Sequence, residues 1–525
     1  PCSRKVRTML TFLQSCRSLF CRKPCRRSSG KTPVNAIPES LEQRQVMSVT
    51  NPWFSGSMLV IPTDNNSTSV ELNSSGSSLQ VRDLSGGRTW NYPSSAVSSV
   101  EFQGGNGNDR FVNNVRFLPV RAFGGAGNDY LEGYDGNDIF SGGSGNDEIR
   151  GFGGNDQMWG GDGNDLLLGG AGNDDLMGEH GNDQLNGQAD IDRFWGGSGD
   201  DVLIALDNST SEYLQSDDGF DVLWVDRNGT ATDRMYANSS SDKVQSISSF
   251  SNGADKTLNG DRIADPASRI VDSSGNVSGA AVKAFTNNPL FASSGPSVND
   301  IRQGSLGDCY FLAGLGAIAV DSPGTLRQNI VDFNDGTYGV RFGNRFYRVD
   351  NDLPVNRTSD TTPCYARLGR ENSMWVAVAE KAFAHYRNNT NSYRGIEGGW
   401  SVEVNRAFGT SSPGDTAFSF YSSMTAMANS IYSRWNNYEA VTVGFSGDAK
   451  KASSNTTPLI LGHMYTVTRV LRDAIGNVTQ IELRNPWGVD GGSTTTGDPN
   501  DGYVLVTPSE LWGLRGLGRI NWGRV

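Results

Sequence analysis

The stretch "GGAGNDYLEGYDGNDIFSGGSGNDEI", Gly124–Ile149, sets the architecture of the N-terminal half of this chain. An aspartate recurs at every ninth position, and an apolar residue stands two positions after each one. The period runs from Asp129 to Asp201, with apolar partners from Leu131 to Leu203. A flexible linker rich in Gly and Asp has no reason to hold an apolar residue in register, so the period indicates a repeat architecture.

The repeat pairs a glycine-rich turn with a very short strand. Glycine permits the left-handed backbone of a tight turn, and the turn carbonyls and aspartate carboxylates are hard oxygen ligands suited to Ca²⁺. One short strand cannot bury its apolar face alone, so the units must stack into a solenoid. We therefore expect several Ca²⁺ ions along the turns. The predicted ligands are Asp129, Asp138, Asp147, Asp156, Asp165, Asp174, Asp183 and Asp201.

These units resemble the RTX nonapeptide G-G-x-G-x-D-x-U-x over about residues 104–204. The resemblance implies a parallel β-roll with Ca²⁺ between successive turns, folding outside the cell where calcium is plentiful. The copy "GQADID", Gly187–Asp192, departs from the pattern, so Asp192 is left out of the expected ligands. The resemblance implies an extracellular or cell-surface protein.

Composition divides the rest of the chain. The first 31 residues carry nine basic residues and no acid, together with Cys2, Cys16, Cys21 and Cys25. No nucleic-acid motif accompanies that charge, and no apolar run is long enough for a membrane span. We predict a basic leader over 1–50, a β-rich cap over 51–103, the calcium-binding roll with its C-terminal cap over 104–226, a linker over 227–289 and a catalytic domain over 290–525.

The stretch "RQGSLGDCYFLAGLG", Arg302–Gly316, places Cys309 at the predicted start of a helix. Free cysteine is usually a packing residue, so this stretch alone favours a structural role. A thiol at a helix N-terminus feels the positive end of the helix dipole, which favours thiolate. The amide of Gln303, on the loop before the helix, would be placed to meet an oxyanion forming near the sulfur.

A thiolate needs a base, and the chain has three histidines. His180 lies in the repeats, and His385 lies in an amphipathic helical pattern typical of packing. His463 starts a predicted strand that turns at "DAIGN" into a second strand ending at Asn485. Both residues then fall at the open end of one hairpin, where Asn485 would orient the imidazole and Trp487 would shield it.

The order Gln, Cys, His, Asn along the chain is the papain-like arrangement. The motifs "QGSLGDCYFL", "GHMYTVTRV" and "RNPWG" resemble those of the calpain family, and the resemblance covers about residues 290–525. The resemblance implies an α+β cysteine protease domain in which Cys309 is the nucleophile, His463 the general base and acid, Asn485 the orienting residue and Gln303 the oxyanion donor. Calcium-gated calpains also bind Ca²⁺ in this domain. Asp300 matches one ligand, but Arg394 replaces an expected acid, so no metal ligand is expected here.

The combined pattern predicts a multidomain, secreted or surface-attached cysteine endopeptidase that acts on proteins or peptides and binds calcium. It predicts neither a nucleic-acid partner nor a membrane-spanning segment. Two alternatives stay open: a calcium-binding adhesion protein with an inactive protease fold, and an acyltransferase that uses the same Cys–His pair.

Overall fold

The computed structural model describes residues 49–524 except 208–210, 228–233, 237–241, 255–264, 269, 272–276, 388–390, 448–458 and 490–500. The predicted leader, with its four cysteines, lies outside the described residues apart from its last two positions. The described residues all fall in one compact unit, Met47–Val525.

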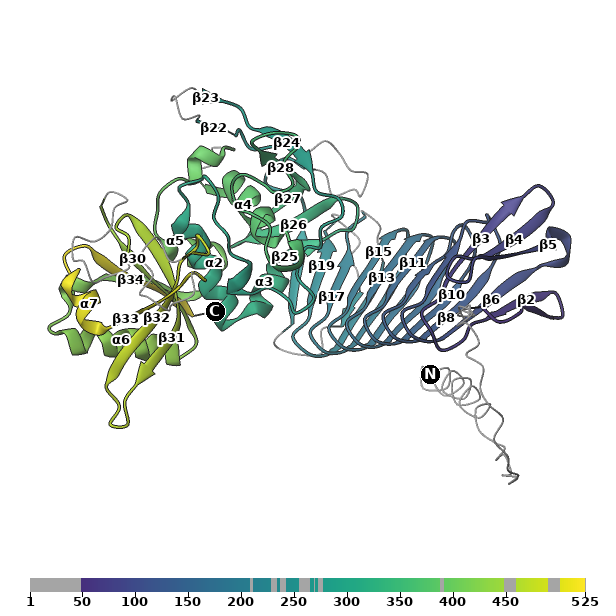
Figure 1. Ribbon diagram of the computed structural model, residues 1–525, viewed down its shortest axis with the longest axis horizontal. Coiled ribbons are helices and arrows are strands. Elements are labelled where there is room, and N and C mark those ends of the chain that lie inside the picture. Colours follow the sequence, from purple (N-terminus) through teal and green to yellow (C-terminus); the bar gives the residue numbers. More distant parts are fainter. Residues whose placement is uncertain are drawn as a thin grey trace, which may run out of the picture. The chain divides into compact units, whose positions relative to one another are not determined.

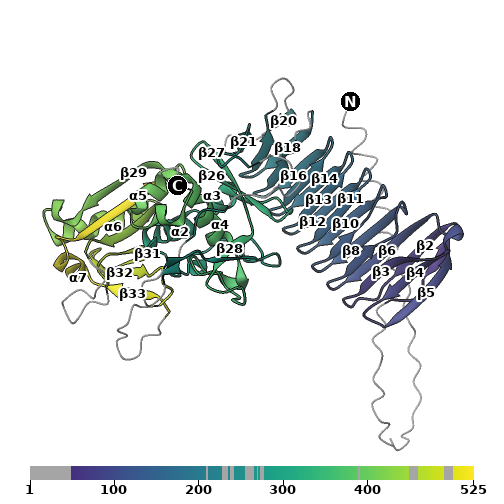
Figure 2. The same ribbon diagram turned by 90° about the horizontal axis from the view of Figure 1, so that it is seen from above.

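The repeats form two parallel sheets, which Figures 1 and 2 show as rungs stacked along the roll. Successive strands alternate between the sheets, so Ile139 pairs with Gln157 two repeats later. One sheet contains β2 (Met58–Pro62), β6 (Ser99–Asn106), β8 (Val120–Ala126), β10 (Ile139–Ser144), β12 (Gln157–Asp162), β14 (Asp175–His180), β16 (Arg193–Ser198), β18 (Tyr213–Asp218) and β20 (Arg234–Tyr236). The other contains β3 (Ser69–Ser75), β7 (Arg110–Asn113), β9 (Tyr130–Glu132), β11 (Glu148–Gly153), β13 (Leu166–Ala171), β15 (Gln184–Ala189), β17 (Val202–Ala205), β19 (Val222–Asp226) and β21 (Lys243–Ile247).

The core of the roll is the column of apolar residues that the repeat predicted. Every one of them is 0% exposed, so each short strand gains its hydrophobic contacts from the rungs above and below it. The column comprises Leu131, Phe140, Ile149, Met158, Leu167, Leu176, Leu185, Phe194 and Leu203.

An antiparallel cap covers the start of the roll, as predicted. β4 (Ser78–Asp83) and β5 (Arg88–Pro93) extend β3, while β1 (Trp53–Ser55) pairs with β2. However, β2 and β3 also pair in parallel with β6 and β7, so part of the cap is a first turn of the roll without the glycine-rich repeat.

The described parts of residues 227–289 contain more strand than a linker would. β20 and β21 pair in parallel with β18 and β19, and so continue the roll. β22 (Ile270–Val271), β23 (Val277–Ser278) and β24 (Ala281–Ala284) follow. These strands are only two to five residues long and lie in a segment rich in Ser and Asn, so they carry little apolar periodicity and the sequence did not reveal them.

The C-terminal part has a helical region and a six-stranded sheet. The helical region contains α2 (Cys309–Asp321), α3 (Pro323–Asn329), α4 (Trp375–Tyr386) and α5 (Ser401–Ala407), with β25 (Ile330–Asp332), β26 (Thr337–Phe342), β27 (Arg345–Asp350) and β28 (Asp352–Val355). The sheet has the order β29 (Ser411–Ala417), β34 (Gly518–Arg524), β30 (Glu439–Phe445), β31 (His463–Arg472), β32 (Val478–Arg484) and β33 (Tyr503–Val506), with α6 (Met424–Asn436) and α7 (Pro508–Gly513) packed nearby.

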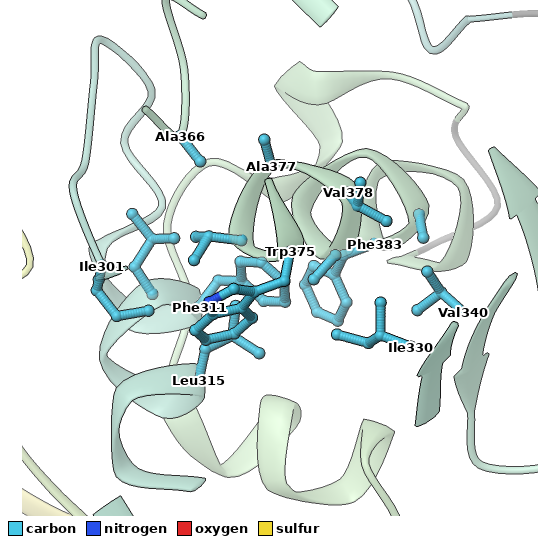
Figure 3. Packing of buried hydrophobic residues seen from close by; sticks show 14 of the residues in the cluster. Ile301, Phe311, Leu315, Ile330, Val340, Ala366, Trp375, Ala377, Val378 and Phe383 are labelled. Carbon is cyan, nitrogen blue, oxygen red and sulfur yellow. The ribbon is translucent and has the colours of Figure 1, made fainter. Parts of the chain in front are cut away.

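α2 is the central element of this part. Its residues from Tyr310 to Ala319 are buried. The side-chain ring of Phe311 stacks on that of Phe383 of α4, with the two ring centroids 4.4 Å apart. Figure 3 shows these rings with Leu315 and Trp375 in one apolar core. No single helix in the described part of the chain has the length and apolar composition to cross a membrane. The bent pair α2 and α3 passes that test together, but α2 is buried in this core.

The last turns of the roll contact the helical region. Trp224 of β19 meets Phe333 edge to face at 6.1 Å. Gln184 and Asn186 donate side-chain hydrogen bonds to the carbonyls of Asp332 and Phe333, at 2.7 and 2.9 Å. An apolar cluster is thus shared between the two parts, and it is formed by Ile204, Leu206, Val222, Trp224, Ile247, Phe250, Val331 and Phe333.

Candidate active site

Cys309 is the first residue of α2, as the sequence predicted. The carbonyl of the preceding Asp308 accepts the N–H groups of Phe311 and Leu312, at 2.8 and 3.2 Å, which starts the helix. α2 is held against β31 by a hydrogen bond of 2.8 Å from the Thr466 hydroxyl to the Ala313 carbonyl. This packing brings the helix N-terminus to the start of β31, where the Met464 N–H bonds the thiol.

His463 and Asn485 meet at the open end of the β31–β32 hairpin, and this predicted hairpin is confirmed. His463 Nε2 lies 2.8 Å from Asn485 Oδ1, and both side chains are buried. The Trp487 ring lies 4.4 Å from the imidazole, and its backbone N–H also bonds Asn485 Oδ1, at 3.0 Å. Because Oδ1 accepts both bonds, the Nε2 atom carries the proton and Nδ1 is left as the basic nitrogen.

Burial keeps the thiol and the imidazole neutral. It raises the pKa of Cys309 to about 11, against the smaller opposing effect of the Met464 N–H. It lowers the pKa of His463 to about 4, against the smaller opposing effect of the bond to Asn485. Among the described residues, no hydrogen bond joins the Cys309 sulfur to His463. The surroundings of the thiol and of the imidazole therefore both favour the uncharged form.

Gln303 is fixed on the loop before α2. Its backbone N–H donates to the Pro486 carbonyl at 2.8 Å, which ties this loop to the segment that follows Asn485. Its side-chain Nε2 donates to the Leu306 carbonyl at 2.6 Å and, more weakly, to Asp308 Oδ1 at 3.3 Å.

Asp300 does not have the free oxygens that a calcium ion requires. Arg370 Nε lies 2.8 Å from Oδ1 of this fully buried carboxylate. Oδ2 accepts the Trp375 indole N–H and the Ser297 backbone N–H, both at 2.9 Å. The arginine beside Asp300 is thus Arg370, whereas Arg394 is exposed. The residues at this position do not fit the core calcium site of calcium-gated calpains.

The roll aspartates are arranged as calcium ligands would be. Oδ1 of each accepts the backbone N–H of a residue on the preceding rung, for example from Asp138 to Asp156 at 2.8 Å, which fixes the carboxylate. Oδ2 is buried and has no hydrogen-bond partner among the described residues. The same arrangement recurs at Asp109, Asp129, Asp138, Asp147, Asp156, Asp165, Asp174, Asp183, Asp192, Asp201 and Asp221.

Unpaired buried carboxylate oxygens fit a hard divalent cation. Burial raises the pKa of these groups, to about 8 at Asp147 and about 9 at Asp201, so the stack is unfavourable as bare anions. No three His, Cys, Asp or Glu side chains converge among the described residues, so backbone carbonyls must complete any calcium shell. Asp192, omitted from the prediction, is placed like its neighbours, and so are Asp109 and Asp221.

The other candidate side chains have structural contacts. Cys364 is buried, and its carbonyl accepts the Ser305 N–H at 2.9 Å. His385 packs beside Tyr347, and His180 Nδ1 bonds the Ser198 hydroxyl at 2.8 Å. The sequence interpretation missed Glu380, which is 2% exposed. The sequence signal for it was a glutamate inside the mostly apolar segment "MWVAVAEKAFAHY".

Comparison with known proteins agrees with this organisation. Residues 272–501 match the sequence model of the calpain family cysteine proteases. Segments 121–149, 150–185 and 181–209 match the RTX calcium-binding nonapeptide repeat.

Curated relatives match the C-terminal part of the chain. Calpain-8 of Mus musculus is 27% identical over 221 residues, which cover 38% of this chain and 29% of the relative. Calpain-5 of Mus musculus is 25% identical over 263 residues, which cover 43% of this chain and 40% of the relative. Calpain-type cysteine protease DEK1 of Zea mays is 28% identical over 210 residues, which cover 38% of this chain and 9% of the relative. The chain spans less than half the length of these relatives. It therefore combines RTX-type calcium-binding repeats with a calpain-like cysteine protease domain.

Proposed function

We propose that this chain is a secreted or surface-attached cysteine endopeptidase whose residues Cys309, His463, Asn485 and Gln303 hydrolyse peptide bonds in protein substrates. The observation that carries the proposal is the buried 2.8 Å bond from His463 Nε2 to Asn485 Oδ1, beside the helix that begins at Cys309. That bond leaves Nδ1 of His463 free to take a proton.

The reaction starts from the neutral pair. The Cys309 sulfur attacks the scissile carbonyl carbon while the thiol proton passes to His463 Nδ1, so no free thiolate is needed beforehand. The carbonyl oxygen becomes an oxyanion, which accepts a hydrogen bond from Gln303 Nε2. His463 then gives its proton to the leaving amine, and a thioester remains on Cys309. Water, deprotonated by His463, attacks the thioester and releases the acid and the free thiol.

In this proposal, calcium binds to the roll and is needed for the roll to fold. The unpaired Oδ2 atoms of Asp129, Asp138, Asp147, Asp156, Asp165, Asp174, Asp183 and Asp201 would hold the ions with nearby turn carbonyls. A requirement for millimolar calcium, of the order of 10⁻³ M, would confine folding of the roll to the outside of a cell.

The test compares two described cysteines. The full chain in Ca²⁺ is treated with a fluorescent iodoacetamide and assayed on labelled casein. Cys309→Ala should abolish cleavage and remove the label from the peptide that contains residue 309, which peptide mapping distinguishes from the other five cysteines of the chain. Cys364→Ala is the matched control, because burial raises the pKa of this thiol to about 11 as well, and the variant should keep both cleavage and the label at Cys309. Cleavage that survives in Cys309→Ala would refute the proposal.

The same samples distinguish the alternatives. A wild-type chain that binds Ca²⁺ but neither takes up the probe at Cys309 nor cleaves casein would be an adhesion protein with an inactive protease fold. An amine acceptor supplied with a peptide donor would yield crosslinked product if the Cys–His pair performed acyl transfer instead of hydrolysis.

A further inference from the structure

Two carboxyl groups buried behind Cys309 have no part in the mechanism above. Asp308, the residue before the thiol, is 0% exposed, and Glu380 on α4 is 2% exposed. Their side chains lie within hydrogen-bonding reach of each other. Lys381, the nearest cation on α4, is turned away and bonds Asp350 and the Asp352 carbonyl, at 2.5 and 2.6 Å.

Each of the two carboxyls has one oxygen with a donor and one without. Asp308 Oδ1 accepts from Gln303 Nε2 at 3.3 Å, and Glu380 Oε2 accepts the Ala366 N–H at 2.9 Å. Asp308 Oδ2 and Glu380 Oε1 are buried and receive no N–H or O–H from another described residue. Two carboxylate oxygens can bond each other in a buried place only when a proton lies between them.

The proton belongs to Glu380. Burial raises the pKa of both groups, to about 6 at Asp308 and well above its usual value at Glu380. Their mutual hydrogen bond lowers the pKa of Asp308 and raises that of Glu380. The other charged group that acts on Asp308 is the acidic Glu397, which raises its pKa. Glu380 is therefore a neutral acid that donates to the Asp308 carboxylate.

Asp308 contacts both halves of the proposed machinery. Its carbonyl starts the helix at Cys309, and its Oδ1 holds the side-chain amide of Gln303. We infer that Glu380, through its contact with Asp308, is a positioning residue that fixes Gln303 and the first turn of α2 for oxyanion stabilisation. This inference rests on the proposed function, because it gives Gln303 its role there.

The activity test compares replacements of Glu380 in the full chain with Ca²⁺ and labelled casein. Glu380→Leu keeps the volume but removes the donor, so kcat should fall at least about tenfold, with KM changed less than about threefold. Glu380→Gln can still donate to Asp308 and accept from Ala366, so it should restore kcat to within about threefold of wild type. If the leucine variant fails to fold, Glu380→Asp replaces it, because the shorter acid cannot reach both partners and should show the same loss.

Val378→Ala is the matched control for packing. Val378 lies on the same helix, is fully buried, and is directed into the apolar core in Figure 3. It should lower the melting temperature yet leave kcat within about twofold of wild type. Equal kcat losses in Glu380→Leu and Glu380→Gln would overturn the inference, and so would wild-type kcat in Glu380→Leu.

An infrared measurement tests the shared proton independently of activity. The difference spectrum between wild type and Glu380→Gln at pH 7 should contain the carbonyl stretching band of a protonated carboxylic acid, shifted in D₂O. Absence of this band would overturn the inference even if the enzyme is active. If the wild type shows no Cys309-dependent cleavage, the proposed function fails, and the infrared band still decides whether Glu380 holds the proton.

Discussion

The bond between His463 and Asn485 fixes one tautomer of the imidazole, and its effect on rate can be measured. In the proposed mechanism, Asn485 orients the ring without touching the proton that moves. Asn485→Ala should therefore lower kcat by about tenfold or more, but less than Cys309→Ala or His463→Ala. Casein cleavage by the three purified variants measures the order of their kcat values. Wild-type rates in Asn485→Ala would remove this residue from the site.

Burial of the imidazole predicts an unusual acid limit for activity. The usual pKa of histidine is about 6.5, whereas that of His463 is lowered to about 4. The proposed reaction needs the neutral ring, and a lowered pKa keeps the ring neutral as the pH falls. The acid limb of kcat/KM should thus lie near pH 4 and not between pH 6 and 7. Samples returned to pH 7 before assay control for acid unfolding, and a reversible limb near pH 6.5 would contradict the prediction.

Individual residues differ in how far their surroundings could be foreseen. His463 and Asn485 were found because a strand–turn–strand pattern fixes which residues meet at its open end. The arginine beside Asp300 was not found, because Arg370 is seventy positions away and no local pattern links the two. Glu380 and Asp308 were missed for the same reason. Contacts between distant segments depend on tertiary packing, which a single sequence does not display.

The turns of the roll allow a sharp comparison between two glycines. Gly163 has a φ of +137°, and a Cβ there would lie 1.9 Å from the Gly145 carbonyl oxygen of the previous rung. Gly163→Ala should destabilise the roll by about 1–3 kcal/mol from backbone strain alone, with the clash added. A far-UV circular dichroism titration of the full chain should show a higher Ca²⁺ midpoint or lost β structure.

Gly153→Ala is the control for this prediction. Its Cβ would meet nothing nearer than 3.6 Å, and its backbone is not left-handed, so the Ca²⁺ titration should match wild type. Equal behaviour of the two variants would mean that rung spacing is not set by these carbonyl contacts.

The elements of the roll were predictable because one local rule repeats with a fixed period. Each nine-residue unit specifies its own turn, strand and inward residue, as Phe140 and Ile149 illustrate. The strands β2 and β3 lack the glycine-rich turn, and their parallel pairing with β6 and β7 comes only from stacking on the next rung. Repeats thus reveal a solenoid in the sequence, while its ends and the packing of α2 on α4 require the structure.

Calcium dependence should be confined to one part of the molecule. The roll contains buried carboxylate oxygens without partners, whereas Asp300 in the protease part is surrounded by Arg370, Trp375 and Ser297. The guanidinium supplies in place the positive charge that a cation would bring. The protease part should accordingly fold and act without calcium, while the roll loses its structure in chelator.

A fragment tests this separation, and the structure decides where it must begin. A start at residue 290 would remove β24, which pairs with β28, and the bond from Asp265 to Lys381. The fragment should therefore begin near residue 265, at the cost of exposing Phe333, which Trp224 covers in the full chain.

The fragment is expected to cleave casein in EGTA at a rate that does not change across a Ca²⁺ titration. Its melting temperature should be lower than that of the protease part in the full chain, because an apolar contact has been removed. The same fragment with Cys309→Ala controls for contaminating proteases. A fragment that is inactive in EGTA and activated by Ca²⁺ would show that the protease part binds a cation of its own, since the roll is absent from it. The ion pair of Asp300 with Arg370 would then not replace that cation.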